Sequence, residues 1–377
     1  MKVFIYVQHL VGIGHLRRAL LLALAMERHG LETVVVSGGR PVSLFPQTRV
    51  RPLPPAHCSP DDYSTLLDDD GRPVTEAWKE RRAALLLEYF EHERPDVLLL
   101  ETFPFGRRQL RFELLPLLES ARFAARRPRI LCSIRDVLQR RSEEREDETI
   151  RLLNDFFDEV WVHGDPDWIG LERSFSRTAD IAPEVVYTGY VSEPWSGNTA
   201  ANGEGVLVSS GGGAAGIALM RCAAEARGLS KARTLPWRFL VGGNLSSDHQ
   251  AELAALAGPG ASIEPVRPDF KDVLAGCRVS ISQFGYNTAV DLLQTRARAV
   301  VVPFEGSGET EQRTRAEAMA GKNLFQVVPE SALTPRSLAE ALGRAMARPR
   351  PEAPAIQLGG AGRCAGWLAG AGVAVSP

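Results

Sequence analysis

The chain has 377 residues, which is enough for two domains of ordinary size. Hydrophobic residues make up 44% and charged residues 24%, as in soluble globular proteins, and the net charge of −2 gives no general affinity for nucleic acid. No apolar run is long enough to span a membrane, and the N-terminus lacks a signal-peptide layout. The five cysteines are scattered without a C-x-x-C pair, so we expect a cytoplasmic protein with free thiols.

The N-terminus begins with a predicted strand, a glycine turn and a helix. Residues 3–7 are apolar and β-branched or aromatic, which predicts a buried strand, and the apolar residues at 16–26 predict a buried helix. Gly12 and Gly14 lie between them, where the backbone can approach a ligand and the first helical N–H groups remain unpaired. His15 follows on the first turn. A G-x-G turn alone is equally compatible with a plain connection between strand and helix.

Residues 12–18 read G-I-G-H-L-R-R and resemble the G-x-G-H-x-x-R motif of family 28 type glycosyltransferases, which include the peptidoglycan N-acetylglucosaminyltransferase. The related UDP-sugar hydrolases of nonulosonic acid synthesis share the motif, with Arg18 at its arginine position. Both groups have the GT-B fold, in which two Rossmann-like domains with parallel sheets face each other across a cleft. The resemblance therefore implies an α/β protein with this fold that binds a nucleotide sugar.

Further buried strands are predicted along the first half of the chain, at residues 31–39, 95–101, 130–134, 160–165 and 185–189. Glu101 and Asp136 stand at the ends of two of them. Because open α/β sheets place their ligands at the carboxyl ends of the strands, both carboxylates are candidate functional groups.

An arginine-rich segment covers residues 107–129, where leucine and phenylalanine alternate with seven arginines. The simpler interpretation is an amphipathic helix with a solvated basic face. The alternative is a surface that contacts the anionic headgroups on the inner face of a membrane.

Composition also divides the chain. Residues 192–205 are rich in glycine, serine and asparagine, which is typical of a linker. We expect a Rossmann-like acceptor-side domain over 1–192 and a Rossmann-like nucleotide-sugar donor domain over 205–345. The remaining residues, 346–377, are expected to form a tether and a terminal helix, and the resemblance implies that this helix returns to the first domain.

Two turns of the second domain suit the phosphates of a nucleotide. One follows a strand and comprises Ser210, Gly211, Gly212, Gly213 and Ala214; the other begins a helix and comprises Gly285, Asn287 and Thr288. Helix N-termini stabilise a diphosphate without a metal ion. The structural alternative is that Asn287 is only a helix cap and Asp291 only a favourable charge near the helix dipole.

The pattern Gly285-x-x-Thr288-x-x-Asp291, followed by Glu311 and Gln312, is similar to the donor-site block of family 28 type glycosyltransferases. The resemblance implies that the glycine and threonine hold the donor phosphate, Asp291 the ribose hydroxyls, and Glu311 with Gln312 the sugar hydroxyls. It also implies that the loop at 211–214 contacts the donor and that Arg267 and Phe270 belong to the base-binding loop. The chain departs from the family in having Asp291 for the usual glutamate and Arg315 before Ala316 for the usual asparagine.

These features together predict an inverting glycosyltransferase that requires no metal and no cofactor. It would move a sugar from a nucleotide-diphosphate donor, UDP-linked, to a hydroxyl of a glycan, lipid or small molecule. His15 is the first choice for the base that removes the acceptor proton, with Glu101 and Asp136 as alternatives. The other hypotheses are a UDP-sugar hydrolase or epimerase on the same fold, and a non-catalytic protein that binds a sugar nucleotide.

Overall fold

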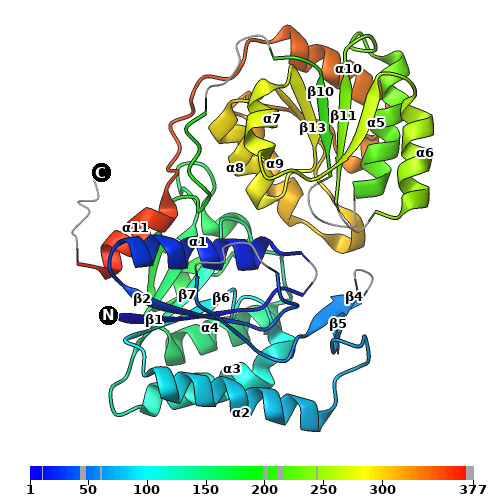
Figure 1. Ribbon diagram of the computed structural model, residues 1–377. Helices are drawn as coiled ribbons and strands as arrows, with labels where there is room; N and C mark the ends of the chain where they lie inside the picture. The colour runs from blue at the N-terminus through cyan, green and yellow to red at the C-terminus, as the bar shows by residue number, and fades with distance from the viewer. Residues whose placement is uncertain are drawn as a thin grey trace. The chain divides into compact units, whose positions relative to one another are not determined.

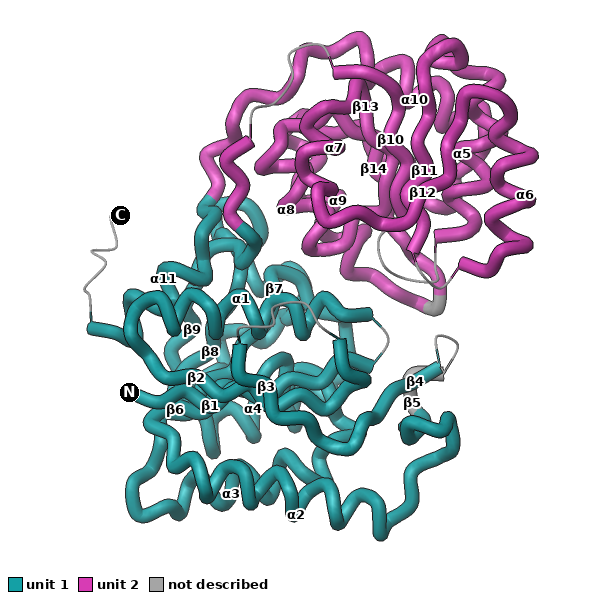
Figure 2. The backbone as a smooth tube through the Cα atoms, in the orientation of Figure 1, with its two compact units in different colours: residues 1–193, 357–377 teal, residues 194–356 magenta. Residues whose placement is uncertain are grey.

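The computed structural model describes residues 1–10, 12–42, 48–59, 62–197, 203–210, 216–242 and 245–370, and for residues 62–64 and 307 the backbone alone. The chain forms two compact units (Figure 2). The first combines Met1–Glu193 with the C-terminal segment from Gln357, and the second is Pro194–Ile356.

The first unit is built on a seven-stranded parallel sheet in the order β3-β2-β1-β6-β7-β8-β9. Its strands are β1 (Lys2–Val7), β2 (Glu32–Ser37), β3 (Val50–Pro52), β6 (Val97–Glu101), β7 (Arg129–Arg135), β8 (Glu159–His163) and β9 (Glu184–Tyr187). A separate antiparallel pair, which the sequence did not predict, consists of β4 (His57–Ser59) and β5 (Asp62–Leu67). The strand order reverses between β1 and β6.

Helices cover both faces of this sheet (Figure 1). One face packs against α1 (Gly14–Arg28) and α11 (Gly360–Leu368), and the other against α2 (Glu76–Glu93), α3 (Arg111–Phe123) and α4 (Glu143–Phe156). Along β1, Val3 and Ile5 point to the α1 side while Phe4 and Tyr6 point to the α2 side. Since both faces are buried, the strand is apolar throughout and does not alternate.

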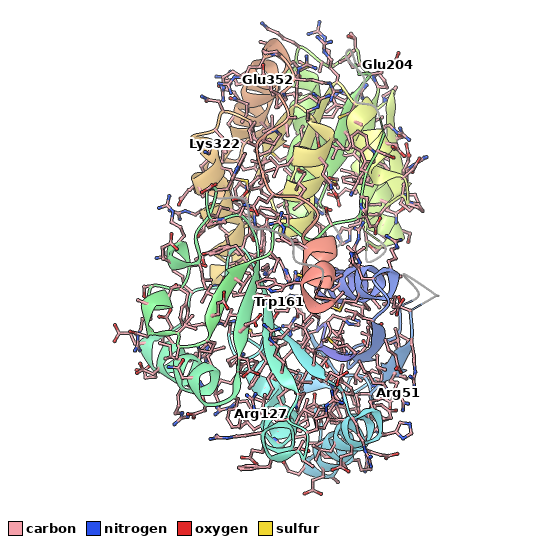
Figure 3. The ribbon with its side chains drawn as sticks, turned by 90° about the vertical axis from the view of Figure 1, so that its left-hand side faces the viewer. Arg51, Arg127, Trp161, Glu204, Lys322 and Glu352 are labelled. Carbon is pink, nitrogen blue, oxygen red and sulfur yellow. The ribbon has the colours of Figure 1, made fainter. Side chains whose placement is uncertain are left out.

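The terminal helix α11 completes the α1 side of the sheet. Its Cys364 and Leu368 are buried in one cluster with residues of α1 and β1. Trp367 stacks on Trp161 of β8 with ring centroids 6.2 Å apart, and Figure 3 shows Trp161 beside this helix. A β-bridge from Tyr190 to Leu358 joins the two places where the chain enters and leaves the first unit.

The second unit contains a six-stranded parallel sheet in the order β12-β11-β10-β13-β14-β15. The strands are β10 (Val206–Ser209), β11 (Trp237–Val241), β12 (Ala261–Pro265), β13 (Val279–Ser282), β14 (Ala299–Val301) and β15 (Gln326–Val327). On one face lie α5 (Ile217–Leu229), α6 (Ser247–Ala257) and α10 (Pro335–Ala347), and on the other α7 (Phe270–Gly276), α8 (Tyr286–Thr295) and α9 (Glu311–Ala320) (Figure 1). The strand order reverses here between β10 and β13.

The arginine-rich segment contains α3, and five of its seven arginines form ion pairs. Arg126 lies 2.6 Å from Asp96, Arg127 lies 3.0 Å from Asp158, and Arg111 pairs with Glu148. These bonds explain the arginines as a solvated face with acidic neighbours, and membrane contact stays a prediction. No helix in the described part of the chain is long and apolar enough to cross a membrane.

Candidate active site

The predicted turns lie where the strand order of each sheet reverses. In the first sheet, β1 and β6 are neighbours, and the chain continues from β1 toward one edge strand and from β6 toward the other. In the second sheet, β10 and β13 are neighbours from which the chain continues toward opposite edge strands in the same way. A crevice opens between the loops after such strands at the carboxyl edge, and ligands of open α/β sheets bind there. The loops after β1 and β6 lead to His15 and Glu101, while the loops after β10 and β13 contain the predicted donor turns.

His15 is on the first turn of α1, and this turn lacks a side-chain cap. The N-cap residue is Ile13, which accepts no hydrogen bond through its side chain, and the first turn contains no acidic residue. A side chain at Gly12 would meet no described atom within 4 Å. Gly12 therefore leaves open space in the turn that precedes His15, at the positive end of the helix dipole.

Glu101 holds His15 in place from the end of β6. Both carboxylate oxygens lie 2.9 Å from Nδ1 of His15, and the Thr102 hydroxyl donates to Oε2 over 2.8 Å. Arg18, one turn after His15, forms an ion pair with Oε1. The side chains of Glu101 and Arg18 are 1% and 3% exposed, whereas His15 is 16% exposed. Of these three ionisable side chains, the imidazole is therefore the most accessible to a substrate.

The electrostatics of the pair favour a carboxylate and a neutral imidazole. Burial is the largest effect on His15 and lowers its pKa to about 3, against the opposing attraction of Glu101. Burial alone would raise the pKa of Glu101, but hydrogen-bonded His15 and the Arg18 guanidinium hold it below its ordinary value. The carboxylate must accept the Nδ1 proton of the neutral imidazole, so Nε2 retains its lone pair.

Asp136, the third candidate base, lies at the same edge of the sheet, directly after β7. It is fully buried, and its own oxygens are occupied: Oδ1 accepts from the Val137 N–H over 2.9 Å and Oδ2 from the Tyr190 hydroxyl over 3.2 Å. These bonds tie the end of β7 to the segment after β9.

A buried polar network supports the loops around His15, and no local sequence pattern predicts it. Arg82 on α2 pairs with Glu113 on α3 over 2.6 Å, and both are fully buried. The same guanidinium donates to the Gly38 carbonyl over 3.0 Å and to Gln8 Oε1 over 2.6 Å. The network thereby fixes the starts of the loops after β1 and β2.

Of the first donor turn, only Ser210 is described; Gly211, Gly212, Gly213 and Ala214 lie outside the described residues. Ser210 is buried directly after β10. Gly216, which precedes α5, packs so closely on Ser210 that a Cβ atom there would overlap the serine Cβ. Gly216 was not predicted, although it lies only three residues after Gly213.

The second donor turn is an uncapped helix start. Gly285 is the N-cap of α8 and supplies no side chain, so Asn287 is not the cap. Asn287 and Thr288 are half-buried on the first turn, and a side chain at Gly285 would meet no atom of the described residues within 4 Å. Asp291 is one turn further on, 9% exposed, with its Oδ1 3.5 Å from the Lys271 ammonium of α7.

The predicted sugar-binding pair lies at the start of α9. Oε1 of Gln312 accepts from the N–H groups of Phe284 and Phe304 over 2.8 and 3.1 Å. Glu311 accepts from Arg315 over 2.8 Å, and that guanidinium is fully buried. These bonds connect the loops after β13 and β14, and a role in sugar binding stays a prediction.

The predicted base-binding loop follows β12. Arg267 is bound by Asp269, with Nε and Nη2 each 2.8 Å from a carboxylate oxygen. Phe270 is half-buried at the start of α7. In this loop the Arg267 guanidinium is therefore bound to Asp269, and the Phe270 ring remains as the group that could stack on a base.

Residues 207–358, which span most of the second unit, match the glycosyltransferase family 28 C-terminal domain. This part of the chain is a domain of that family, and the chain is a glycosyltransferase. Such a glycosyltransferase uses a nucleotide-sugar donor. No curated protein matches the chain by sequence.

Solved glycosyltransferases resemble the chain over nearly its whole length. MurG of Acinetobacter baumannii has a TM-score of 0.58 and 16% identity, covering 94% of this chain and 97% of its own. The spinosyn forosaminyltransferase SpnP has a TM-score of 0.61 and 13% identity, covering 98% and 93%. The spinosyn rhamnosyltransferase SpnG, complexed with thymidine diphosphate, has a TM-score of 0.57 and 15% identity, covering 98% of this chain and 95% of its own. At these identities the likeness shows the fold, and the predicted GT-B fold is confirmed.

Proposed function

We propose that this glycosyltransferase is inverting, works without a metal ion and takes its sugar from a UDP-linked donor. The observation that carries the proposal is the pairing of His15 with Glu101 at the point where the first sheet reverses its strand order. The uncapped start of α8 at the corresponding point of the second sheet supports a metal-free diphosphate site.

In the proposed reaction, Nε2 of His15 accepts the proton of the acceptor hydroxyl while the hydroxyl oxygen attacks the anomeric carbon. The bond from that carbon to the diphosphate oxygen breaks, and the diphosphate leaves with the electron pair. One displacement from the opposite side inverts the anomeric configuration. The transition state has oxocarbenium character, as in glycoside hydrolysis.

Glu101 acts on the base and does not touch the acceptor in this proposal. It fixes the tautomer of His15 and stabilises the imidazolium that forms, as the acidic member of a triad does. Its 1% exposure and its bonds to Arg18 and Thr102 argue against direct proton removal. The complete burial of Asp136 argues against it in the same way.

The departing diphosphate gains negative charge, which the N–H groups at the start of α8 would stabilise. Asn287 and Thr288 supply side-chain donors on the same turn. We extend the proposal to the donor contacts of Ser210, the loop at 211–214 and Asp291, on the family resemblance.

Replacing His15 by alanine tests the base. Loss of a general base should lower kcat by about 10²–10⁴ with little change in nucleotide affinity. His29→Ala is the matched control, since His29 is exposed at the other end of the same helix. A near-normal kcat in His15→Ala would overturn the assignment.

Product analysis with a labelled UDP-sugar separates transfer from hydrolysis. A transferase releases free sugar slowly when no acceptor is present, whereas rapid release would favour a hydrolase. Activity that EDTA abolishes and manganese restores would contradict the metal-free reaction. Thermal shifts with UDP and thymidine diphosphate test the base preference, because the tighter ligand stabilises the fold more.

A further inference from the structure

Five arginines gather at the amino edge of the second sheet, at the opposite end of its strands from the donor turns. Arg278 directly precedes β13 and Arg298 directly precedes β14; these strands are paired neighbours. Arg296 ends α8, while Arg348 and Arg350 follow the end of α10. We call these residues the arginine cluster: Arg278, Arg296, Arg298, Arg348 and Arg350.

Hydrogen bonds hold the cluster together but use only part of its capacity. Arg350 Nη2 donates to the carbonyls of Ala275 and Cys277 over 2.9 and 2.6 Å, and Arg298 Nε donates to the Arg348 carbonyl over 2.7 Å. Nη1 of Arg298 and both Nε and Nη1 of Arg350 are buried and have no hydrogen-bond partner among the described residues. Buried donors of this kind cost free energy when they remain unpaired.

No acidic side chain in the described part of the chain neutralises the cluster. Among the described residues, none of the five arginines forms an ion pair. Burial is the main effect that lowers the pKa of Arg298 and of Arg350, and neighbouring arginines lower it further. Glu204 and Glu352 are exposed at this end of the unit, as Figure 3 shows, and neither pairs with the cluster.

A purely structural explanation accounts for part of this charge. Three helices, α7, α8 and α10, end at this edge, and each C-terminus is equivalent to roughly half a negative charge. They would offset about one and a half of the five positive charges. An anion would balance the remaining charge and accept from these three nitrogens.

We propose that the arginine cluster is a second anion site, which binds phosphate groups. Guanidinium groups form paired, charge-assisted hydrogen bonds with phosphate oxygens. The unpaired nitrogens of Arg298 and Arg350 supply donors from inside, and the exposed Arg296 and Arg348 supply charge from outside. The same chemistry fits a soluble polyphosphate and the headgroup of an anionic phospholipid. The site is independent of the donor turns and of the proposed function.

The test replaces the two exposed members, because Arg298 and Arg350 also bind backbone carbonyls. The cluster variant is Arg296→Glu with Arg348→Glu, and the control variant is Arg81→Glu with Arg336→Glu, which changes the charge equally at exposed sites elsewhere. The probes are sodium tripolyphosphate, followed by calorimetry, and vesicles of phosphatidylglycerol or phosphatidylcholine, followed by sedimentation.

We expect the unmodified protein to bind tripolyphosphate or phosphatidylglycerol vesicles, more weakly as salt is added. The cluster variant should bind about tenfold more weakly or worse, because four units of charge change close to the anion. The control variant should bind as the unmodified protein does. Tripolyphosphate bound at the donor turns would be equal in both variants, so the difference measures the cluster.

Binding of tripolyphosphate would identify a soluble source, and binding of phosphatidylglycerol vesicles alone would identify a lipid headgroup. The proposal is overturned if the unmodified protein binds neither probe. Equal binding by the cluster and control variants overturns it as well.

Discussion

Replacing Glu101 by glutamine separates the two roles of its carboxylate, which orients His15 and pairs with Arg18. In the native protein two oxygens accept from Arg18, His15 and Thr102. Glutamine has one accepting oxygen, which should stay with the charged Arg18 because charge-assisted bonds are the strongest. Its NH₂ group then faces Nδ1 of His15. The imidazole must accept there and carry its proton on Nε2, where it can no longer act as a base.

The magnitudes follow from this geometry. A histidine held in the wrong tautomer should lower kcat by about 10³–10⁴. Arg18 is 3% exposed, and in the Glu101→Gln protein it would donate to a neutral amide oxygen and lose the attraction of the carboxylate charge. Hydrogen bonds to charged groups contribute about 1.5–3 kcal/mol, so the free energy of unfolding should fall by about 2–3 kcal/mol. Loss of the whole buried pair would cost more.

The assay combines initial rates with a labelled donor and urea denaturation of the same preparation. Glu91→Gln, an exposed change of the same type on α2, is the control and should alter neither quantity. A folded Glu101→Gln protein with kcat within threefold of the unmodified enzyme would refute the His15–Glu101 pair. Unchanged stability would contradict the role of Glu101 as the partner of Arg18.

Three further outcomes are expected. Gly216→Ala should lower the free energy of unfolding by about 1–3 kcal/mol because its Cβ overlaps Ser210, whereas Gly343→Ala, in open space inside α10, should raise it by about 0.5–1 kcal/mol in urea denaturation. Burial lowers the pKa of His163 to about 3, whereas in the unfolded chain the imidazole has its ordinary pKa of 6.5. As the pH falls from 6.5 toward 3, only the unfolded chain binds this proton, so the free energy of unfolding should fall. Equal unfolding midpoints at pH 7 and pH 5 would contradict this. Asp291→Ala should weaken UDP binding by about 1.5–3 kcal/mol in calorimetry if its carboxylate binds the ribose, and unchanged affinity in a folded protein would exclude that contact.

The sequence predicted the parts of the fold that local pattern determines. Strands buried on both faces are continuous apolar runs, and the glycine turns that follow β1, β10 and β13 are visible in the residue order. The short β3 and the β4–β5 pair were missed, because they are half-polar and flanked by proline. β3 and β4 have three residues each, which are too few positions to show an alternation of polar and apolar residues.

The candidate site was predictable only in part for a related reason. His15 and Glu101 were named separately from their turns, but 86 positions separate them, and only the pairing of β1 with β6 brings them together. The sequence therefore left the choice of base open between them. Thr102, Lys271 and Arg82 carry no local signal, since each acquires its partner through tertiary packing.

The position of α11 bears on how the protein is made. A ribosome adds about 5–20 residues per second, and domains of a nascent chain usually fold in the order in which they emerge. Here the first unit emerges with the apolar side of α1 uncovered, since Cys364 and Leu368 are translated only after the whole second unit. The second unit is continuous and can therefore finish folding first. Termination before Gln357 would leave Trp161 without its stacking partner and expose an aggregation-prone surface for the life of the fragment.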